Sequence, residues 1–193
     1  MNLTKNPNIP NALDTRLITR AFDFAARAHV DQRRKGEVGE PYVNHLAEVA
    51  ALLAEAAQDD FGLIAAGLLH DTVEDTAVTS ADLESVFGAD VATLVAEVTD
   101  DQALPKQERK RRQVTSSPGR SDRAKMLKLA DKASNLRALV VTPPDWDLER
   151  RREYVAWAAE VIAGCRGVDG FLEEAFDAAH AAAVEALAAE ADA

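Results

Sequence analysis

Alanine-rich stretches with apolar residues at three- and four-residue intervals run through most of this chain, and this periodicity limits the folds that it can adopt. The spacing places apolar side chains along one face of an α-helix. We find no alternating run of β-branched residues bounded by hairpin turns, as a β-sheet would need. The sequence therefore predicts an all-α fold in which amphipathic helices bury their apolar faces against one another.

Capping residues and helix breakers divide the chain into successive helices. Thr79 can cap a short helix that has Asp82 at its third position and Gly88 beyond its end. Helices are expected over 14–30, from about 45, from about 60, between 79 and 88, across 91–98, from about 105, over 121–140, over 148–163 and over 170–189. We see no repeat and no second domain. Residues 1–193 are thus expected to form one domain, with residues 1–12 as a flexible N-terminal segment.

Cysteine content and the N-terminal sequence indicate a reducing compartment. The single cysteine, Cys165, cannot form a disulfide within the chain, and we expect it to be buried without a chemical role. The stretch MNLTKNPNIPNALD lacks the apolar core of a signal peptide. No stretch approaches the roughly 20 apolar residues that span a bilayer. These features predict a cytoplasmic protein with no membrane partner.

The charge of the chain is unevenly distributed. The formal net charge is −11, which argues against a stable complex with nucleic acid. The segment from Pro105 to Lys132 nevertheless carries a net positive charge, because its lysines and arginines outnumber its acids. This basic segment is either a solvated helix face or a wall that binds a polyanion.

The segment LLHDTVEDT places candidate metal ligands next to two further carboxylates. His70 and Asp71 are adjacent, and Glu74 and Asp75 each follow four residues later, on the same face of a helix. In the alternative interpretation, His70 and Asp71 only pair at a helix end while the carboxylates lie in solvent. The apolar residues before His70 predict burial, where an unpaired charge is costly, and this favours a metal ion.

Two further motifs supply partners for these ligands. PYVNHL places His45 at a helix start, and KMLKLADKASNL places Asp131 and Asn135 on one helix face. Taken alone, the first is typical of a capping or core histidine and the second of an ordinary amphipathic helix. Together with His70 and Asp71 they offer two imidazoles and two carboxylates, a ligand set that suits one Mn²⁺ ion and leaves positions for water and substrate.

In combination and order, several stretches resemble the hydrolase half of the RelA/SpoT family, specifically the small stand-alone alarmone hydrolases that include the animal SpoT homologue. The resemblance covers nearly the whole chain. The matching stretches are FDFAARAHVDQRRK, GEPYVNH, LLHDTVEDT, VAEVTDDQALPKQERKRRQV, SSPG, KLADKASNLRAL and REYVAWAAEV. The resemblance implies a single HD-domain helical bundle with a metal site between its helices.

The family pattern also implies a role for individual residues. The metal ligands would be His45, His70, Asp71 and Asp131, and the residues that orient or deprotonate the attacking water would be Glu74 and Asp75. Substrate contacts would come from Arg34, Lys35, Lys106, Asn135 and Tyr154, for each of which a plain surface position is the alternative. His29 is expected to support the site or to pack, His180 has no assigned role, and Trp157, Phe171 and Phe176 are expected in the core.

By this resemblance, the expected activity is Mn²⁺-dependent removal of the 3′-pyrophosphate from guanosine tetraphosphate or pentaphosphate, with GDP or GTP as the other product. We expect no synthetase or regulatory domain beside the HD domain, and the oligomeric state is open, a homo-oligomer included. One alternative keeps the site but acts as an NADPH 2′-phosphate phosphatase or on another nucleotide. A second alternative is a nucleotide sensor or nucleic-acid binder without activity, which Glu74 and Asp75 argue against.

The chain departs from the family pattern at three places. Leu46 follows His45 where many relatives have proline, and Lys132 stands where long bifunctional enzymes often have arginine. The segment between Lys35 and Pro41 is longer than in those enzymes. This length suits the stand-alone group and leaves the base selectivity open.

Overall fold

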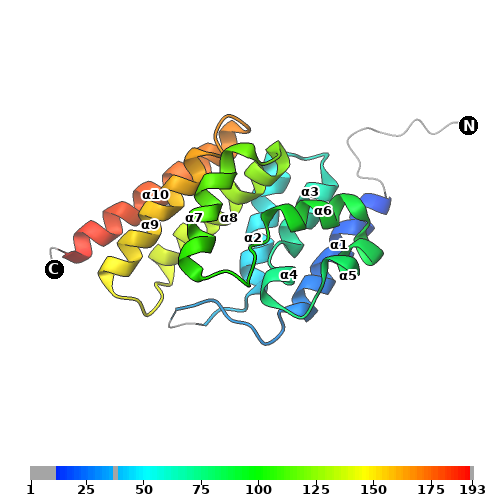
Figure 1. The fold of residues 1–193 in the computed structure, drawn as a ribbon, viewed down its shortest axis with the longest axis horizontal. Coiled ribbons are helices and arrows are strands. Elements are labelled where there is room, and N and C mark those ends of the chain that lie inside the picture. The colour runs from blue at the N-terminus through cyan, green and yellow to red at the C-terminus, as the bar shows by residue number, and fades with distance from the viewer. Residues whose placement is uncertain (1–11, 37–38, 192–193) are drawn as a thin grey trace, which may run out of the picture.

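A computed structural model describes residues 12–36 and 39–191, and helices dominate this part of the chain (Figure 1). The expected N-terminal segment therefore lies outside the described residues, apart from Ala12, which begins the first helix. The helices are α1 (Ala12–Ala28), α2 (Val43–Ala56), α3 (Phe61–Leu69), α4 (Thr72–Asp75), α5 (Ser80–Phe87), α6 (Ala89–Val98), α7 (Lys106–Ser116), the 3₁₀ turn η1 (Ser117–Gly119), α8 (Asp122–Val141), α9 (Leu148–Ala163) and α10 (Gly170–Ala191). Within these residues the only β-type pairing is an isolated bridge between Arg33 and Pro41, so the all-α prediction is confirmed.

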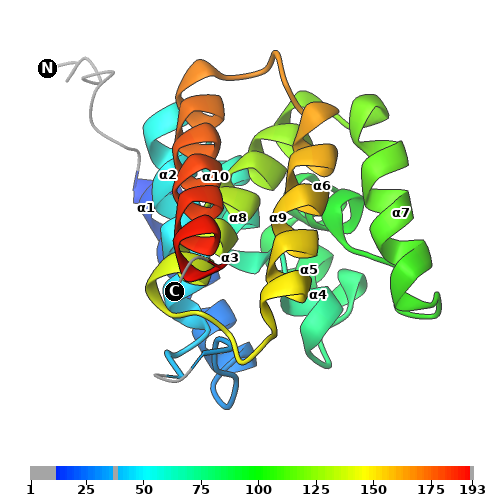
Figure 2. The same cartoon turned by 90° about the vertical axis from the view of Figure 1, so that its left-hand side faces the viewer.

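Helix α8 is the centre of the molecule. Figure 1 shows α1 to α6 gathered at one end and α9 and α10 at the other, with α7 and α8 between them. Helix α8 packs against α2, α6, α9 and α10, and Figure 2 shows α9 lying between α10 and α7. All residues from 127 to 134 are buried, so two turns of α8 are enclosed on every side. Charged side chains on these two turns are therefore buried as well.

A close approach of α2 and α3 fixes one side of the site. A Cβ atom on Gly67 of α3 would lie 2.6 Å from Cδ1 of Leu53 on α2, which is closer than real Cβ contacts. The glycine therefore lets the two helices pack tightly. This contact brings His45, near the start of α2, toward His70, which directly follows α3.

Side-chain caps fix the starts of four helices, α3, α5, α8 and α9, close to where the sequence predicted them. Thr79 accepts a hydrogen bond from the backbone of Asp82, whose side chain accepts one in return from the Thr79 backbone, so the expected cap is a full capping box. The helix expected over 148–163 has those bounds. Cys165 is buried, as expected, and no described helix has the length and apolar character needed to cross a bilayer.

One helix prediction is wrong, because the segment carrying His70 to Asp75 is not a continuation of α3. That helix ends at Leu69, and α4 begins at Thr72. The His70 ring donates to the carbonyl of Gly67, and the Thr72 hydroxyl donates to the carbonyl of Leu69. Side chains thus satisfy carbonyls at the end of α3, and the chain turns between the two helices.

The three aromatic residues expected in the core differ in how deeply they are buried. Phe176 is buried, whereas Trp157 is only partly buried and Phe171 is 45% exposed. Phe171 precedes the fully buried Leu172 in the first turn of α10, and neighbouring helix residues point about 100° apart. The core prediction for Phe171 is therefore wrong, because Leu172 occupies the inward direction.

We expect Leu129→Ala in α8 to lower the free energy of unfolding by about 2–5 kcal/mol, since truncating an enclosed leucine leaves a cavity. Leu129 is fully buried, whereas Val141 at the end of the same helix is 77% exposed. Val141→Ala is the matched control and should change stability by less than about 0.5 kcal/mol. Urea unfolding followed by circular dichroism measures both, and equal effects would contradict the central placement of α8.

Candidate functional site

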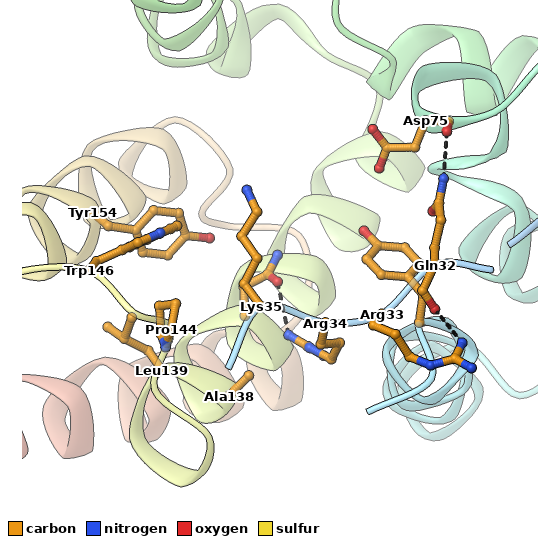
Figure 3. Close-up of a pocket in the computed structure, with 12 residues that line it drawn as sticks. Gln32, Arg33, Arg34, Lys35, Asp75, Ala138, Leu139, Pro144, Trp146 and Tyr154 are labelled. Carbon is orange, nitrogen blue, oxygen red and sulfur yellow. Dashed lines mark hydrogen bonds between the residues drawn. The ribbon is translucent and has the colours of Figure 1, made fainter. Parts of the chain in front are cut away.

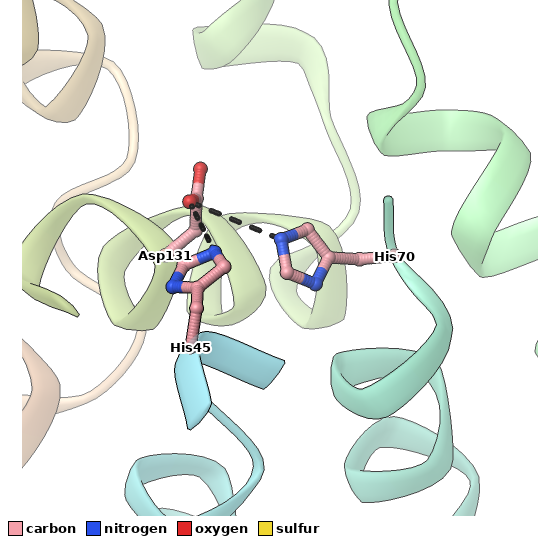
Figure 4. A group of neighbouring side chains, drawn as sticks. All are labelled: His45, His70 and Asp131. Atoms are coloured by element: carbon pink, nitrogen blue, oxygen red, sulfur yellow. Dashed lines mark ion pairs between the residues drawn. The ribbon is translucent and has the colours of Figure 1, made fainter. Parts of the chain in front are cut away.

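The four predicted metal ligands meet where three segments of the chain converge. His45 comes from α2, His70 from the turn between α3 and α4, and Asp131 from α8 (Figure 4). Asp71 follows His70 in the same turn. One ligand atom from each of His45, His70 and Asp131 lies within 4.8 Å of the others. Oδ2 of Asp71 lies 3.0 Å from Nε2 of His70 and 3.6 Å from Nε2 of His45. The structure thus brings all four side chains together.

Hydrogen bonds to the outer ring nitrogens indicate how both imidazoles are oriented. Nδ1 of His70 lies 2.8 Å from the carbonyl oxygen of Gly67, which can only accept, so this nitrogen carries the proton. Nδ1 of His45 lies 2.9 Å from Oγ of Ser134. The Nε2 atoms of both rings are buried and have no hydrogen-bond partner among the described residues.

This arrangement fits a divalent cation. Nε2 of His45 lies 3.5 Å and Nε2 of His70 lies 3.9 Å from the same oxygen, Oδ1 of Asp131. A ring lone pair that faces a carboxylate oxygen repels it unless a positive charge lies between them, and a proton or a metal ion can supply that charge. Two imidazole nitrogens and two carboxylates form a mixed nitrogen and oxygen ligand set for a divalent metal ion.

The electrostatics of the cluster follow from burial and from its two carboxylates. Burial lowers the pKa of His45 below its ordinary value. Burial also acts to lower the pKa of His70, but the adjacent Asp71 carboxylate outweighs it and raises the pKa to about 9. Burial opposes ionisation of Asp71, yet the charge of His70 holds the pKa of Asp71 below its ordinary value. The cluster therefore attracts one positive charge.

Asp131 is held in place by its own helix neighbours. Nζ of Lys132 donates to Oδ2 of Asp131 over 2.9 Å, and Nδ2 of Asn135 donates to Oδ1 over 2.6 Å. The Lys132 ammonium also lies 4.9 Å from the centre of the Trp157 ring, a cation–π contact. These contacts leave Oδ1 directed at the two imidazoles.

The two predicted catalytic carboxylates face different surroundings. Oε2 of Glu74 accepts a hydrogen bond of 3.1 Å from the backbone of Asp100, and Oε1 lies 3.8 Å from Arg109. The side chain of Asp75 lines a pocket beside the metal cluster. Burial raises the pKa of both Glu74 and Asp75 above their ordinary values, which brings each closer to the range of a general base.

A pocket of about 470 Å³ contains most of the predicted substrate contacts (Figure 3). Arg34, Lys35, Asn135 and Tyr154 all line it, and Figure 3 shows Asp75 on the side of the pocket away from Tyr154. An Arg34 guanidinium nitrogen donates to the Asn135 side chain over 3.1 Å. The pocket thus combines cationic groups with an aromatic wall.

Lys106 lies outside this pocket and lines a neighbouring one of about 220 Å³. Lys35 and Tyr154 belong to both pockets, so they form the boundary between them. The second pocket also receives Arg109 and Lys110 from α7, which is part of the basic segment. This segment therefore contributes a cationic wall next to the main pocket, although some of its charges pair with acids, as Arg111 does with Glu108.

Several pocket residues were not found by sequence reasoning. Trp146 lines both pockets, and its ring lies 5.7 Å from the Lys35 ammonium and 4.3 Å from the Arg150 guanidinium. The Tyr42 hydroxyl donates to Oδ2 of Asp71 over 2.6 Å, and Gln32 donates to the backbone oxygen of Asp75. Tyr42 stands in the PYVNHL motif and was recoverable from it. Trp146 lies in a connection that carries no periodic signal.

The two remaining histidines are not ligands in this arrangement. The His29 ring stacks on Tyr42 with centroids 5.0 Å apart, and its Nδ1 lies 2.6 Å from the Gln32 side chain. His29 thus supports Tyr42, which in turn contacts Asp71. His180 stacks on Phe176, also in α10.

Comparison with known proteins places these features in a family. A family model of the HD domain matches residues 21–163. The protein named guanosine-3′,5′-bis(diphosphate) 3′-pyrophosphohydrolase MESH1 from Homo sapiens is 53% identical over 157 residues, which cover 80% of this chain and 88% of that protein. Its Danio rerio counterpart is 48% identical over 166 residues, covering 85% of this chain and 92% of that protein.

Comparison with a solved structure supports the same family on the basis of the fold. The structure described as "A metazoan ortholog of SpoT hydrolyzes ppGpp and plays a role in starvation responses" has a TM-score of 0.83 and 45% identity to this chain. The alignment covers 89% of this chain and 96% of the solved one. From the family match, the identities and the shared fold, we conclude that this chain belongs to the HD-domain family, in the group that contains the metazoan SpoT orthologues.

Proposed function

We propose that this chain is a Mn²⁺-dependent guanosine 3′,5′-bis(diphosphate) 3′-pyrophosphohydrolase, which also accepts the pentaphosphate. The observation that carries the proposal is the pair of buried Nε2 atoms that face Asp131 and Asp71. These two carboxylates contact Asn135 and Tyr42, which line a cation-lined pocket. The names of the relatives from Homo sapiens and Danio rerio support the same reaction. A nucleotide with a diphosphate at each end of its ribose matches the two adjoining pockets.

Each group of residues has a distinct part in this proposal. Arg34, Lys35, Asn135 and Tyr154 hold the nucleoside and its nearer phosphates in the main pocket, while Lys106 binds a phosphate in the neighbouring one. Holding the substrate in one orientation converts the attack of water into an effectively intramolecular step. The two negatively charged diphosphates thereby meet cationic side chains in both pockets, which Lys35 and Tyr154 separate.

The chemistry takes place where Asp75 and the metal cluster meet. A divalent cation bound by His45, His70, Asp71 and Asp131 would lower the pKa of water and polarise a phosphoryl oxygen. Glu74 and Asp75 orient the attacking water and accept its proton. The water oxygen bonds to the phosphorus attached to the 3′ oxygen. The bond between that phosphorus and the 3′ oxygen then breaks, and the 3′ oxygen takes up the proton that the carboxylate had accepted, which frees a 3′ hydroxyl and intact pyrophosphate.

We expect chelation of the purified protein to abolish turnover and added Mn²⁺ to restore it best among divalent ions, because the ligand set has imidazoles and carboxylates and no thiolate. Turnover is measured by product chromatography after dialysis against a chelator, with metal content determined by mass spectrometry. Undiminished hydrolysis by metal-free protein would contradict the assignment of all four ligands.

Glu74→Gln and Asp75→Asn should each lower kcat by about 10²-fold or more, the usual scale for loss of a general base, while metal content stays near that of the parent protein. His70→Ala and Asp71→Ala should instead lose the metal, because each removes a ligand. Metal analysis and kinetics on the same preparations compare the two pairs. If both pairs retained or lost metal alike, the proposed division of roles would be wrong.

With guanosine 3′,5′-bis(diphosphate) as substrate, we expect GDP and pyrophosphate in equal amounts, and no release of orthophosphate. Lys106→Ala should raise KM more than it lowers kcat, as expected for a contact made equally in the ground and transition states. Chromatography and steady-state kinetics test both statements. A protein that left this nucleotide intact but dephosphorylated NADPH would replace the proposal with the NADPH 2′-phosphate alternative.

A further inference from the structure

The Ser134 hydroxyl joins the metal cluster to the nucleotide pocket and to a carboxylate that has no role so far. Ser134 is fully buried. Its Oγ lies 2.9 Å from Nδ1 of His45, 3.3 Å from a guanidinium nitrogen of Arg34 and 2.6 Å from Oε2 of Glu48. A metal ligand, a predicted substrate contact and Glu48 thus converge on one oxygen.

The chemistry of these groups determines the direction of each hydrogen bond. A serine hydroxyl has one proton to donate and two lone pairs that accept. A guanidinium can only donate and a carboxylate can only accept, so the Ser134 proton goes to Glu48 and one lone pair accepts from Arg34. The second lone pair then accepts from His45, which places the imidazole proton on Nδ1. Nε2 of His45 is left with its lone pair toward Asp131.

Two packed helices, α2 and α8, hold this chain of hydrogen bonds from Glu48 through Ser134 to His45, which we call the relay, in position. His45 and Glu48 are three residues apart on α2, and Ser134 and Arg137 are three residues apart on α8, so each pair shares one helix face. Arg137 donates to Oε1 of Glu48 over 3.0 Å, which leaves Oε2 for Ser134. Arg137 therefore fixes the Glu48 side chain, and Glu48 fixes the serine proton.

Without Glu48 the serine proton has no fixed acceptor. The hydroxyl could then rotate and donate to Nδ1 of His45, which would move the imidazole proton to Nε2. A protonated Nε2 has no lone pair for a metal ion. Hydrogen bonds to the outer nitrogen of a ligating histidine set its tautomer and orientation in this way.

We propose that Glu48 is a positioning residue, which acts through Ser134 to keep the Nε2 lone pair of His45 available to the cation. The inference rests on the metal site of the proposed function, and it adds a control over that site that lies outside the ligand set. The Glu48 side chain is 33% exposed and the Arg137 side chain is 41% exposed. An ion pair so accessible to solvent contributes little to stability, so its effect should appear in metal binding and not in unfolding.

The first test is Mn²⁺ affinity, measured by electron paramagnetic resonance titration of the full chain without nucleotide. Glu48→Leu should raise the dissociation constant by about 10-fold or more, the scale of losses at residues that support metal ligands. Glu48→Gln should stay close to the parent protein, because its amide oxygen still accepts the serine proton. Glu55→Leu is the matched control, since Glu55 is an exposed glutamate on the same helix, and it should have no effect.

The second test observes the His45 tautomer directly in metal-free protein by long-range proton–nitrogen NMR correlation. The chain has only 4 histidines, and the His45 signals are assigned by their loss in His45→Asn. The parent protein and Glu48→Gln should show a protonated Nδ1 at His45. Glu48→Leu and Ser134→Ala should shift the ring toward the other tautomer. Thermal unfolding of Glu48→Leu should match that of Glu55→Leu.

Two results would overturn the role of Glu48. One is a Mn²⁺ affinity and His45 tautomer in Glu48→Leu that equal those of Glu55→Leu. The other is an equal loss in Glu48→Gln and Glu48→Leu, which would show that charge acts and not the hydrogen bond. If the parent protein bound no Mn²⁺, the proposed function would fail, while the tautomer measurement would still decide the relay.

Discussion

Two buried ring nitrogens that face carboxylates set the main constraint on this structure. Nε2 of His45 and Nε2 of His70 point at Asp131 and Asp71, and neither meets a hydrogen-bond donor among the described residues. Burying such groups without a compensating positive charge is costly. The elements that carry these side chains, α2, α8 and the turn after α3, are therefore held so that a positive charge, from a proton or a metal ion, can lie between the rings and the carboxylates.

Helix α8 contributes to this arrangement because it places charged side chains in the middle of the protein. Residues 127–134 are all buried, and they include Lys128, Asp131 and Lys132. Such charges need partners close by, because water cannot solvate them there. Asp131 has Lys132 and the imidazoles, while the Lys132 ammonium also contacts Trp157. Asn135 connects this cluster to the substrate pocket, because it donates to Asp131 and lines that pocket, while Trp157 lines the neighbouring pocket.

The candidate ligands could be predicted from sequence because each stands in a short motif with its own chemistry. The position of Glu74 relative to these ligands could not be predicted in the same way. A continuous helix would have stacked Glu74 on His70, but the Thr72 and His70 side chains satisfy the last carbonyls of α3 and end it. Glu74 consequently meets the backbone of Asp100, and Asp75 reaches the pocket. Trp146 was missed because a loop residue leaves no periodic pattern.

By itself, the sequence determined the helices, their caps and the donor types available to a cation, because these depend on neighbours a few residues apart. Only the tertiary structure decided which carboxylates the ring nitrogens of His45 and His70 face. Ser134 illustrates the difference: in the sequence it is a small residue in an amphipathic helix, and its contact with Glu48 lies 86 positions away. The state of the His45 ring depends on that contact, since a hydroxyl proton follows the strongest acceptor within reach, and packing alone determines which acceptor that is.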